Sequence, residues 1–325
     1  ETVHATLGNT PASSAPSAPT EPDPVDGPGR EEFGRLAASH SVVPVWRELL
    51  ADLTTPVALF TRCVGDSNGF LLESVDRGES WGRWSFIGLN PSLTLTLSGG
   101  SLTAQGVLPA GVGTDDGILV ALQGLLEHFR SPDIGGLPPL HGGLMGFLGY
   151  DVVREVEHLP DTPPDDRGFP DGVMSVIGDL VAIDHWRQRA VLIANVVVPD
   201  AVDETNLDLL YTEAQDRLDR LAAAGAAPLD EPLMMPPDQV DEAPVTTSSM
   251  SRDDYCLAVE AAREHILAGD IFQVVLSQRF DVELDAEPFD VYRVLRQINP
   301  SPYMYFLRYP DMTVVGSSPE PMVQL

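Results

Sequence analysis

Lysine is absent from the 325 residues, so all nineteen basic residues are arginine. A guanidinium group neither gives up its proton near neutral pH nor forms a Schiff base. The absence therefore excludes a lysine-dependent P-loop, a Schiff-base enzyme and a lysine general base. Cysteine is scarce as well, and Cys63 and Cys256 form no C-x-x-C pair. We expect two reduced, partly buried thiols and no disulfide framework.

Positive charge is in short supply, with 19 basic residues against 49 acidic ones and a net charge of -30. Such a field repels phosphate backbones and anionic lipid surfaces, which argues against nucleic-acid and membrane-surface binding. No run of about eighteen apolar residues could span a bilayer. Residues 1–30 lack the basic and apolar regions of a signal peptide, so we expect a cytoplasmic protein. The histidines form no H-E-x-x-H pattern, which leaves a zinc site without support.

The hydrophobic fraction of 43% is enough for a buried core. Residues 1–32 are mostly small, polar, acidic or proline and predict a disordered acidic tail. Residues 33–225 form the expected N-terminal domain, in which Gly99-Gly100 marks a hairpin. Apolar spacing there predicts helices at 46–53, 57–63, 116–129 and 203–224, and strands at 70–75, 84–89, 93–97, 101–105, 172–184 and 190–198.

A linker or surface loop is expected at 226–250, where proline and polar residues show little periodicity. A second domain then begins at 251, where Ser251 and Asp254 resemble a capping box and Gly269 ends the helix. We further predict a long strand at 271–284, a helix at 288–298, and strands at 303–307 and 313–315. Residues 322–325 resemble another strand, so we expect the domain to continue beyond Leu325. Hairpins beside helices predict an α+β fold of largely antiparallel sheets.

Two glycine-rich motifs have ordinary structural interpretations. Gly65-Asp66-Ser67-Asn68-Gly69 matches G-x-S-x-G, but a nucleophile elbow needs a strand before the serine and a helix after it. Here the order is reversed, which favours a surface loop. The glycines between Gly142 and Gly149 lack G-x-G-x-x-G spacing and favour close packing of strand backbones over a nucleotide site.

Two further segments, 69–75 (GFLLESV) and 299–305 (NPSPYMY), have the residues of a small-ligand site. Two prolines stiffen the second segment and present backbone carbonyls at a defined angle. Tyr303 and Met304 offer an aromatic and a polarisable wall, while Glu73 and Ser74 offer groups for an ammonium or a carboxylate. The same residues also fit a rigid connection and an ordinary edge strand, and their chemistry alone leaves both interpretations open.

Five segments together resemble component I of anthranilate synthase, a member of the chorismate-utilising superfamily. The resemblance runs in order from about Phe33 to Leu325 and implies that family's layered sandwich of antiparallel sheets and helices. The segments are FLLESVDRGESWGRWSFIG at 70–88, GGLMGFLGYDVVRE at 142–155, GDIFQVVLSQRF at 269–280, NPSPYMYF at 299–306 and VGSSPEPMV at 315–323.

The resemblance implies a lyase of tryptophan biosynthesis that converts chorismate and ammonia to anthranilate and pyruvate. It implies a glutamine amidotransferase partner that supplies the ammonia, and feedback inhibition by tryptophan. The family's inhibitor site uses the L-L-E-S strand and the N-P-S-P-Y-M loop. The candidate tryptophan-contacting residues are therefore Glu73, Ser74, Asn299, Pro302, Tyr303 and Met304.

Gln273 is the candidate active-site residue of the expected long strand. Isochorismate-forming relatives have a lysine at the matching position, where it acts as a base on water. Glutamine takes up no proton at ordinary pH. Ammonia needs no such base, so an amide favours amination of chorismate over hydration. A structural role for Gln273 within the strand is the alternative.

The family's G-T-R-x-R-G segment, catalytic histidine and magnesium-binding glutamates do not occur in these 325 residues. We therefore expect Mg²⁺ ligands beyond Leu325 and no activity from this fragment alone. The rival interpretations are aminodeoxychorismate synthase component I, which also uses ammonia, and a tryptophan-binding regulatory module without catalysis. The N-P-S-P-Y-M loop favours anthranilate synthase over the first rival.

Overall fold

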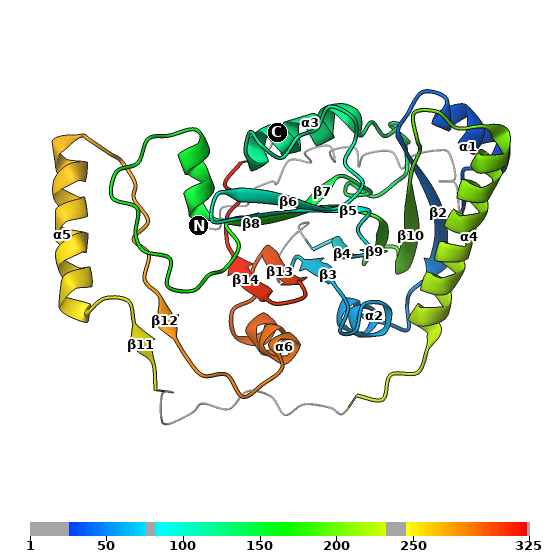
Figure 1. Ribbon diagram of the computed structural model, residues 1–325. Helices are drawn as coiled ribbons and strands as arrows, with labels where there is room; N and C mark the ends of the chain where they lie inside the picture. Colours follow the sequence, from blue (N-terminus) through cyan, green and yellow to red (C-terminus); the bar gives the residue numbers. More distant parts are fainter. Residues whose placement is uncertain (1–25, 76–81, 232–244, 324–325) are drawn as a thin grey trace, which may run out of the picture. The chain divides into compact units, whose positions relative to one another are not determined.

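A computed structural model describes residues 26–75, 82–231 and 245–323 of the chain (Figure 1). Most of the expected tail and the middle of the expected linker lie outside these ranges. The expected tail reaches too far, because residues 26–27 are a strand and residues 30–32 begin a helix. The chain divides into two compact units: unit 1 comprises residues up to 65 and 84–227, and unit 2 comprises 66–83 and 228–325. Helices and antiparallel strands occur in both, which confirms the α+β class. The expected domain boundaries at 225 and 250 stay a prediction.

One antiparallel sheet of unit 1 has the strand order β1-β2-β10-β9-β4. Its long central pair, β2 and β10, runs in register from Val42 opposite Val197 to Leu50 opposite Arg189. Helix α4 places the apolar face formed by Leu207, Ala214, Leu218 and Leu221 against this sheet. The elements are β1 Asp26–Gly27, α1 Arg30–Ala37, β2 Val42–Leu50, α2 Pro56–Cys63, β4 Trp84–Leu89, β9 Asp179–Asp184, β10 Arg189–Val197 and α4 Glu204–Ala226.

The other sheet of unit 1 has the order β6-β5-β8-β7, and helix α3 packs its apolar face against it (Figure 1). Gly99 and Gly100 form the expected turn between β5 and β6 with positive φ angles of 54° and 77°. A Cβ atom at Gly146 would lie 1.9 Å from the carbonyl oxygen of Val173, so the expected close backbone packing is confirmed. The elements are β5 Leu93–Ser98, β6 Ser101–Gly106, α3 Ile118–His128, β7 Leu144–Leu148, the 3₁₀ helix η1 Tyr150–Glu155 and β8 Gly172–Val176.

Two predictions for unit 1 are wrong. The expected helix at 46–53 is the second half of β2 followed by a turn, because the apolar run from Val42 is buried on both faces of a sheet. Such a run lacks the period-two alternation that identifies a half-exposed strand. The single strand expected at 172–184 is two strands in different sheets, β8 and β9. They part near Gly178, where a Cβ atom would lie 1.8 Å from the carbonyl oxygen of Asn90.

Unit 2 contains three antiparallel strands in the order β3-β13-β14, and helix α6 packs against β13 and β14. Helix α5 begins as expected, with the Asp254 amide donating to Ser251 Oγ at 3.1 Å, and ends at left-handed Gly269. The elements are β3 Gly69–Glu73, β11 Thr247–Ser248, α5 Arg252–Ala268, β12 Phe280–Asp281, α6 Pro288–Ile298, β13 Tyr303–Arg308 and β14 Thr313–Ser318.

The long strand expected at 271–284 is another wrong prediction. Only Phe280–Asp281 is a strand, paired with Thr247–Ser248, and the rest is irregular. Its residues have high β propensity, but a strand also needs backbone hydrogen bonds from a neighbour. Among the described residues only β11 supplies them. Residues 322 and 323, expected to begin another strand, are irregular, and 324–325 lie outside the described ranges.

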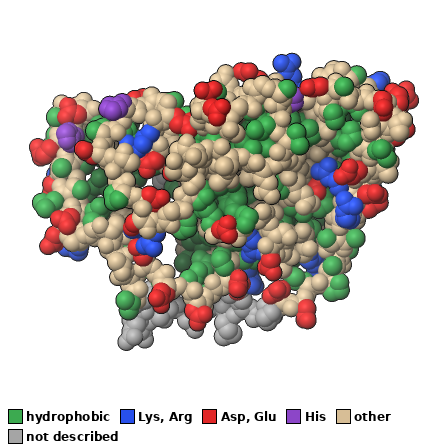
Figure 2. Space-filling model, viewed as in Figure 1, with side chains coloured by type: hydrophobic (Ala, Val, Ile, Leu, Met, Phe, Trp, Pro, Cys, Tyr) green, Lys and Arg blue, Asp and Glu red, His purple; other side chains and the backbone are tan. Residues whose placement is uncertain are grey.

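The surface matches the charge of the sequence. Acidic and arginine side chains are scattered over the face drawn in Figure 2. Both cysteines are free: Cys63 is half-buried, while Cys256 is exposed and not partly buried as expected. Within the described ranges, no helix is both long and apolar enough to cross a membrane.

Candidate functional site

The two segments that sequence analysis singled out lie side by side in unit 2. Strand β3 pairs antiparallel with β13, with Glu73 opposite Met304 and Gly69 opposite Arg308. Beyond the strand end, the Val75 amide donates to the carbonyl oxygen of Ser301 at 3.0 Å. Segments more than 200 residues apart in the sequence are therefore joined by a ladder of backbone hydrogen bonds.

The proline loop that leads into β13 is held at both ends. Asn299 caps the C-terminus of α6, where its amide donates to Leu295, and its carbonyl accepts from Ser317 Oγ at 2.9 Å. Ser301 is buried and donates to the carbonyl of Ser318. Pro302 follows directly and is half-buried. The loop is thus hydrogen-bonded at both ends.

Alternation along the strands divides the candidate residues between two faces. Residues directly opposite each other in a ladder point to the same side, so Glu73 and Met304 share the face that α6 covers. Met304 is 1% exposed there. Ser74 and Tyr303 come next along each chain and by alternation point to the opposite face. The structure brings the four residues to one strand end, but not to one side of it.

Glu73 is the most strongly bound of the candidates. The residue is 6% exposed, and both of its carboxylate oxygens have partners on α6. Tyr292 Oη donates to Oε2 at 2.7 Å, Arg296 Nη2 donates to Oε1 at 2.8 Å, and Arg296 Nε lies 2.7 Å from Oε2. The paired and hydrogen-bonded charge can remain ionised in an apolar surrounding. We call these three side chains the Glu73 cluster.

Aromatic packing holds the Glu73 cluster in place. The Tyr292 ring is fully buried, and its centroid lies 5.7 Å from that of the Phe306 ring. The Phe289 ring packs against Phe306 with a centroid distance of 5.0 Å. Burial, with the charge of Glu73 adding to it, raises the pKa of the Tyr292 phenol above its ordinary value. The phenol therefore stays protonated and remains a hydrogen-bond donor to Glu73.

Sequence analysis missed Tyr292 and Arg296. They stand four residues apart on α6, a spacing that places both on one helix face. The only local signal was that spacing of an aromatic and a cationic residue. Their common partner, Glu73, precedes them by 219 and 223 residues, and nothing in the sequence connects them.

Ser74 has the opposite character to Glu73. Its hydroxyl oxygen is buried, and no hydrogen-bond partner for it exists among the described residues. A buried hydroxyl without a partner is costly, and it is available to a ligand. Tyr303, next to it by register, is half-buried. On the face away from α6, a hydroxyl and an aromatic ring can therefore contact a small molecule, whereas Glu73 is already neutralised.

Gln273 lies apart from this arrangement in the chain. It is exposed in the irregular stretch between α5 and β12, so it does not occupy the strand that its proposed active-site role assumed. Across residues 26–75, 82–231 and 245–323, no group of three or more histidine, cysteine or acidic side chains could hold a metal ion. The described residues thus do not fit a magnesium centre, and no magnesium ligand is assigned to them.

A protein-family model described as chorismate binding enzyme matches residues 79–325. Among curated proteins, "Anthranilate synthase component 1" of Mycobacterium tuberculosis (strain ATCC 25618 / H37Rv) is 42% identical over 315 residues. The alignment covers 90% of this chain and 58% of the relative. The protein of the same name from Pseudomonas putida is 40% identical over 304 residues, covering 91% and 60%.

Among solved structures, component I of anthranilate synthase from Streptococcus pneumoniae TIGR4 is similar with a TM-score of 0.55 and 28% identity. The similarity covers 84% of this chain and 57% of that one. The chain therefore spans about three fifths of the length of the relatives that it matches. Both the sequence and the fold point to the same group of proteins.

Proposed function

Since the chain belongs to the chorismate binding enzyme family, we propose that its gene product is the large subunit of anthranilate synthase. Identity of 42% to the Mycobacterium tuberculosis component over 90% of the chain is the observation that carries the proposal. The reaction joins ammonia to the chorismate ring as a hydroxyl group leaves as water. Elimination of pyruvate then gives the aromatic product, which makes the enzyme a carbon–oxygen lyase of tryptophan biosynthesis.

An assay of the full-length protein tests this assignment. Chorismate, Mg²⁺ and ammonium are supplied, and anthranilate is followed by its fluorescence, with pyruvate measured separately. We expect equal amounts of the two products. A 4-amino product without anthranilate would instead assign the protein as component I of aminodeoxychorismate synthase. Chain 1–325 assayed in parallel is expected to be inactive, because it spans only about three fifths of its relatives.

A magnesium ion and a second subunit belong to the same proposal. Mg²⁺ neutralises substrate carboxylates in sites built from hard oxygen ligands. We expect activity to disappear with EDTA and to return with added Mg²⁺. We expect glutamine to replace ammonium only when a glutamine amidotransferase subunit is present. A cytoplasmic location is also part of the proposal, and cell fractionation tests it.

Tryptophan is the proposed feedback inhibitor, and the paired ends of β3 and β13 are its proposed site. The stiff loop with Asn299 and Pro302, the unpartnered Ser74 hydroxyl and the Tyr303 ring support it. Met304 and Glu73 contribute from the α6 side, where Glu73 already has two partners. An incoming ammonium group therefore shares or displaces the contacts of Arg296.

The inhibitor site is tested by the tryptophan concentration that halves activity of the full-length enzyme. Ser74→Ala removes one hydrogen bond to the ligand, so we expect about a tenfold increase in that concentration. Ser98→Ala, an exposed serine of β5, is the matched control and leaves it unchanged. An unchanged value for Ser74→Ala would remove Ser74 from the site without affecting the enzyme assignment. A regulatory module without catalysis would bind tryptophan in calorimetry yet form no anthranilate.

A further inference from the structure

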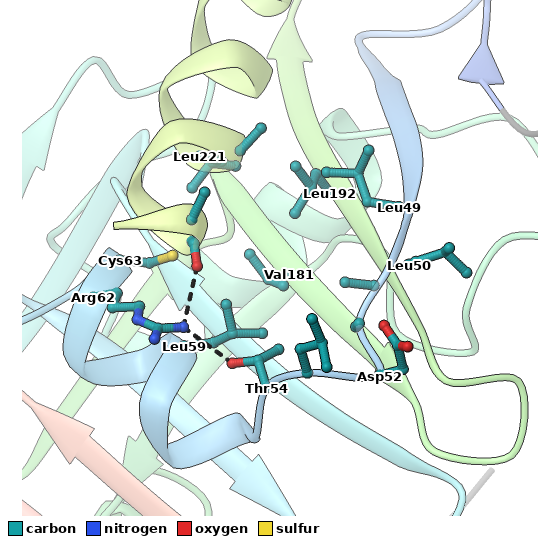
Figure 3. A pocket seen from close by; sticks show the side chains of 16 residues that line it. Leu49, Leu50, Asp52, Thr54, Leu59, Arg62, Cys63, Val181, Leu192 and Leu221 are labelled. Atoms are coloured by element: carbon teal, nitrogen blue, oxygen red, sulfur yellow. Dashed lines mark hydrogen bonds between the residues drawn. The ribbon is translucent and has the colours of Figure 1, made fainter. Parts of the chain in front are cut away.

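Unit 1 contains a cavity of about 410 Å³ between α2, α4 and one end of the β2–β10 pair (Figure 3). The volume lies in the range of small-molecule sites, which are mostly apolar with few polar groups. None of its lining residues belongs to β3, β13 or α6, so it is separate from the candidate inhibitor site. Its walls are mainly aliphatic and include Leu49, Leu59, Val181, Leu192, Leu221 and Ala222.

One cation enters this apolar space. Arg62, in the last turn of α2, donates from Nη1 to Thr54 Oγ1 and to the carbonyl oxygen of Gly225, both at 3.2 Å (Figure 3). Its Nε is buried and has no hydrogen-bond partner among the described residues. The guanidinium group is thus held by neutral acceptors, and its buried Nε has no acceptor among the described residues.

No carboxylate within the described ranges forms an ion pair with Arg62. Asp52 also lines the cavity, but its side chain is exposed and lies across the cavity from Arg62 in Figure 3. A partly buried charge without a counter-ion is unfavourable, and charge-assisted hydrogen bonds to an anion are strong. The cavity therefore combines the cation of Arg62, which has no ion-pair partner among the described residues, with mainly aliphatic walls.

We propose that this cavity binds a small amphipathic carboxylate, with its carboxylate on Arg62 and its apolar tail against Leu59 and Leu192. The single cation matches one negative charge, whereas a phosphate dianion would leave a charge unpaired against aliphatic walls. The tail gains free energy from the apolar surface that it removes from water.

Cys63 also lines the cavity but takes no covalent part. Burial raises the pKa of its thiol to about 11, so it is protonated at neutral pH and forms part of the wall. The site is therefore one of reversible binding, with Arg62 as the anion-recognising group.

Calorimetric titration of the full-length protein with octanoate and with the neutral 1-octanol tests the proposal. We expect octanoate to bind at least about tenfold more tightly, because only it forms charge-assisted hydrogen bonds. Arg62→Gln removes the charge but keeps a polar amide, and should abolish the difference. The matched control is Arg220→Gln, an exposed arginine of α4 that does not line the cavity, and it should change neither affinity.

A second variant keeps the test decisive if Arg62→Gln fails to fold. Ala222→Phe fills the cavity from α4 and should abolish octanoate binding, while circular dichroism checks that the protein is folded. Three results would each overturn the proposal: no octanoate binding to the folded protein, equal affinity for octanol, or octanoate binding that both variants leave intact. The last would mean that octanoate binds elsewhere on the surface.

Discussion

Replacing Arg296 by methionine should open the β3–β13 pair far more often than replacing any neighbouring arginine. Arg296 makes two contacts to a carboxylate whose side chain is only 3% exposed. Removing one partner of a buried ion pair leaves an uncompensated charge and costs about 3–5 kcal/mol. At about 1.4 kcal/mol per factor of ten, the lower figure makes local opening about a hundred times more frequent.

Hydrogen exchange of the peptides that cover β3 and β13 measures this opening directly. The control is Arg293→Met on the same helix, where Arg293 pairs at 2.8 Å with Asp290, whose side chain is 40% exposed and not 3% like that of Glu73. Exposed pairs of this kind contribute about 0–1 kcal/mol, so the control should change exchange by less than about tenfold.

The second half of the experiment removes both charges of the Glu73–Arg296 pair. Glu73→Gln combined with Arg296→Met removes both charges, so the double variant should exchange more slowly than Arg296→Met alone. Equal exchange in Arg296→Met and Arg293→Met would refute the reasoning. The stability of the β3–β13 pair would then not depend on the ion pair between Glu73 and Arg296. The reasoning would also be contradicted if the free-energy change of the double variant equalled the sum of the changes in Glu73→Gln and Arg296→Met.

Further predictions concern other parts of the chain. Gly178→Ala places a methyl group 1.8 Å from the backbone oxygen of Asn90, so we expect it to lower the thermal midpoint by several degrees in calorimetry. Ser251→Ala removes the cap of α5 and should cost about 1 kcal/mol, measured by exchange of the first helical turn. Exposed Cys256 should react with iodoacetamide well before Cys63, whose reaction should accelerate only as pH approaches about 11. An unfolded thiol ionises near 9.0 and the folded one near 11, so the contribution of Cys63 to stability should fall as pH rises between these values.

Local signals predicted much of the secondary structure. The helix α5 follows from Ser251 at its start and Gly269 at its end, and the β5–β6 turn follows from two adjacent glycines that tolerate positive φ. These signals depend on atoms within a few residues of one another. The α+β class followed from the same hairpins and helices.

Structural features that depend on partners distant in the sequence could not be predicted. The β2 segment, 42–50, resembles a helix because burial on both faces erases its alternation. The apolar stretch at 271–284 has strand propensity, yet only two of its residues find a described neighbour. Of the candidate site, the meeting of the two segments was expected from the resemblance. The distribution of Ser74 and Met304 over opposite faces depends on register, which no residue type specifies.

Unit 2 is discontinuous in the sequence. Its strand β3 lies in residues 66–83, and residues 84–227 of unit 1 separate β3 from the rest of unit 2. During synthesis, Glu73 emerges 230 residues before the start of β13. At ribosomal rates of about 5–20 residues per second, that interval is roughly 10–50 seconds. Throughout that interval, β3 lacks its β13 partner. A gene split near residue 227 is therefore expected to yield two pieces that must reassemble through the β3–β13 pair.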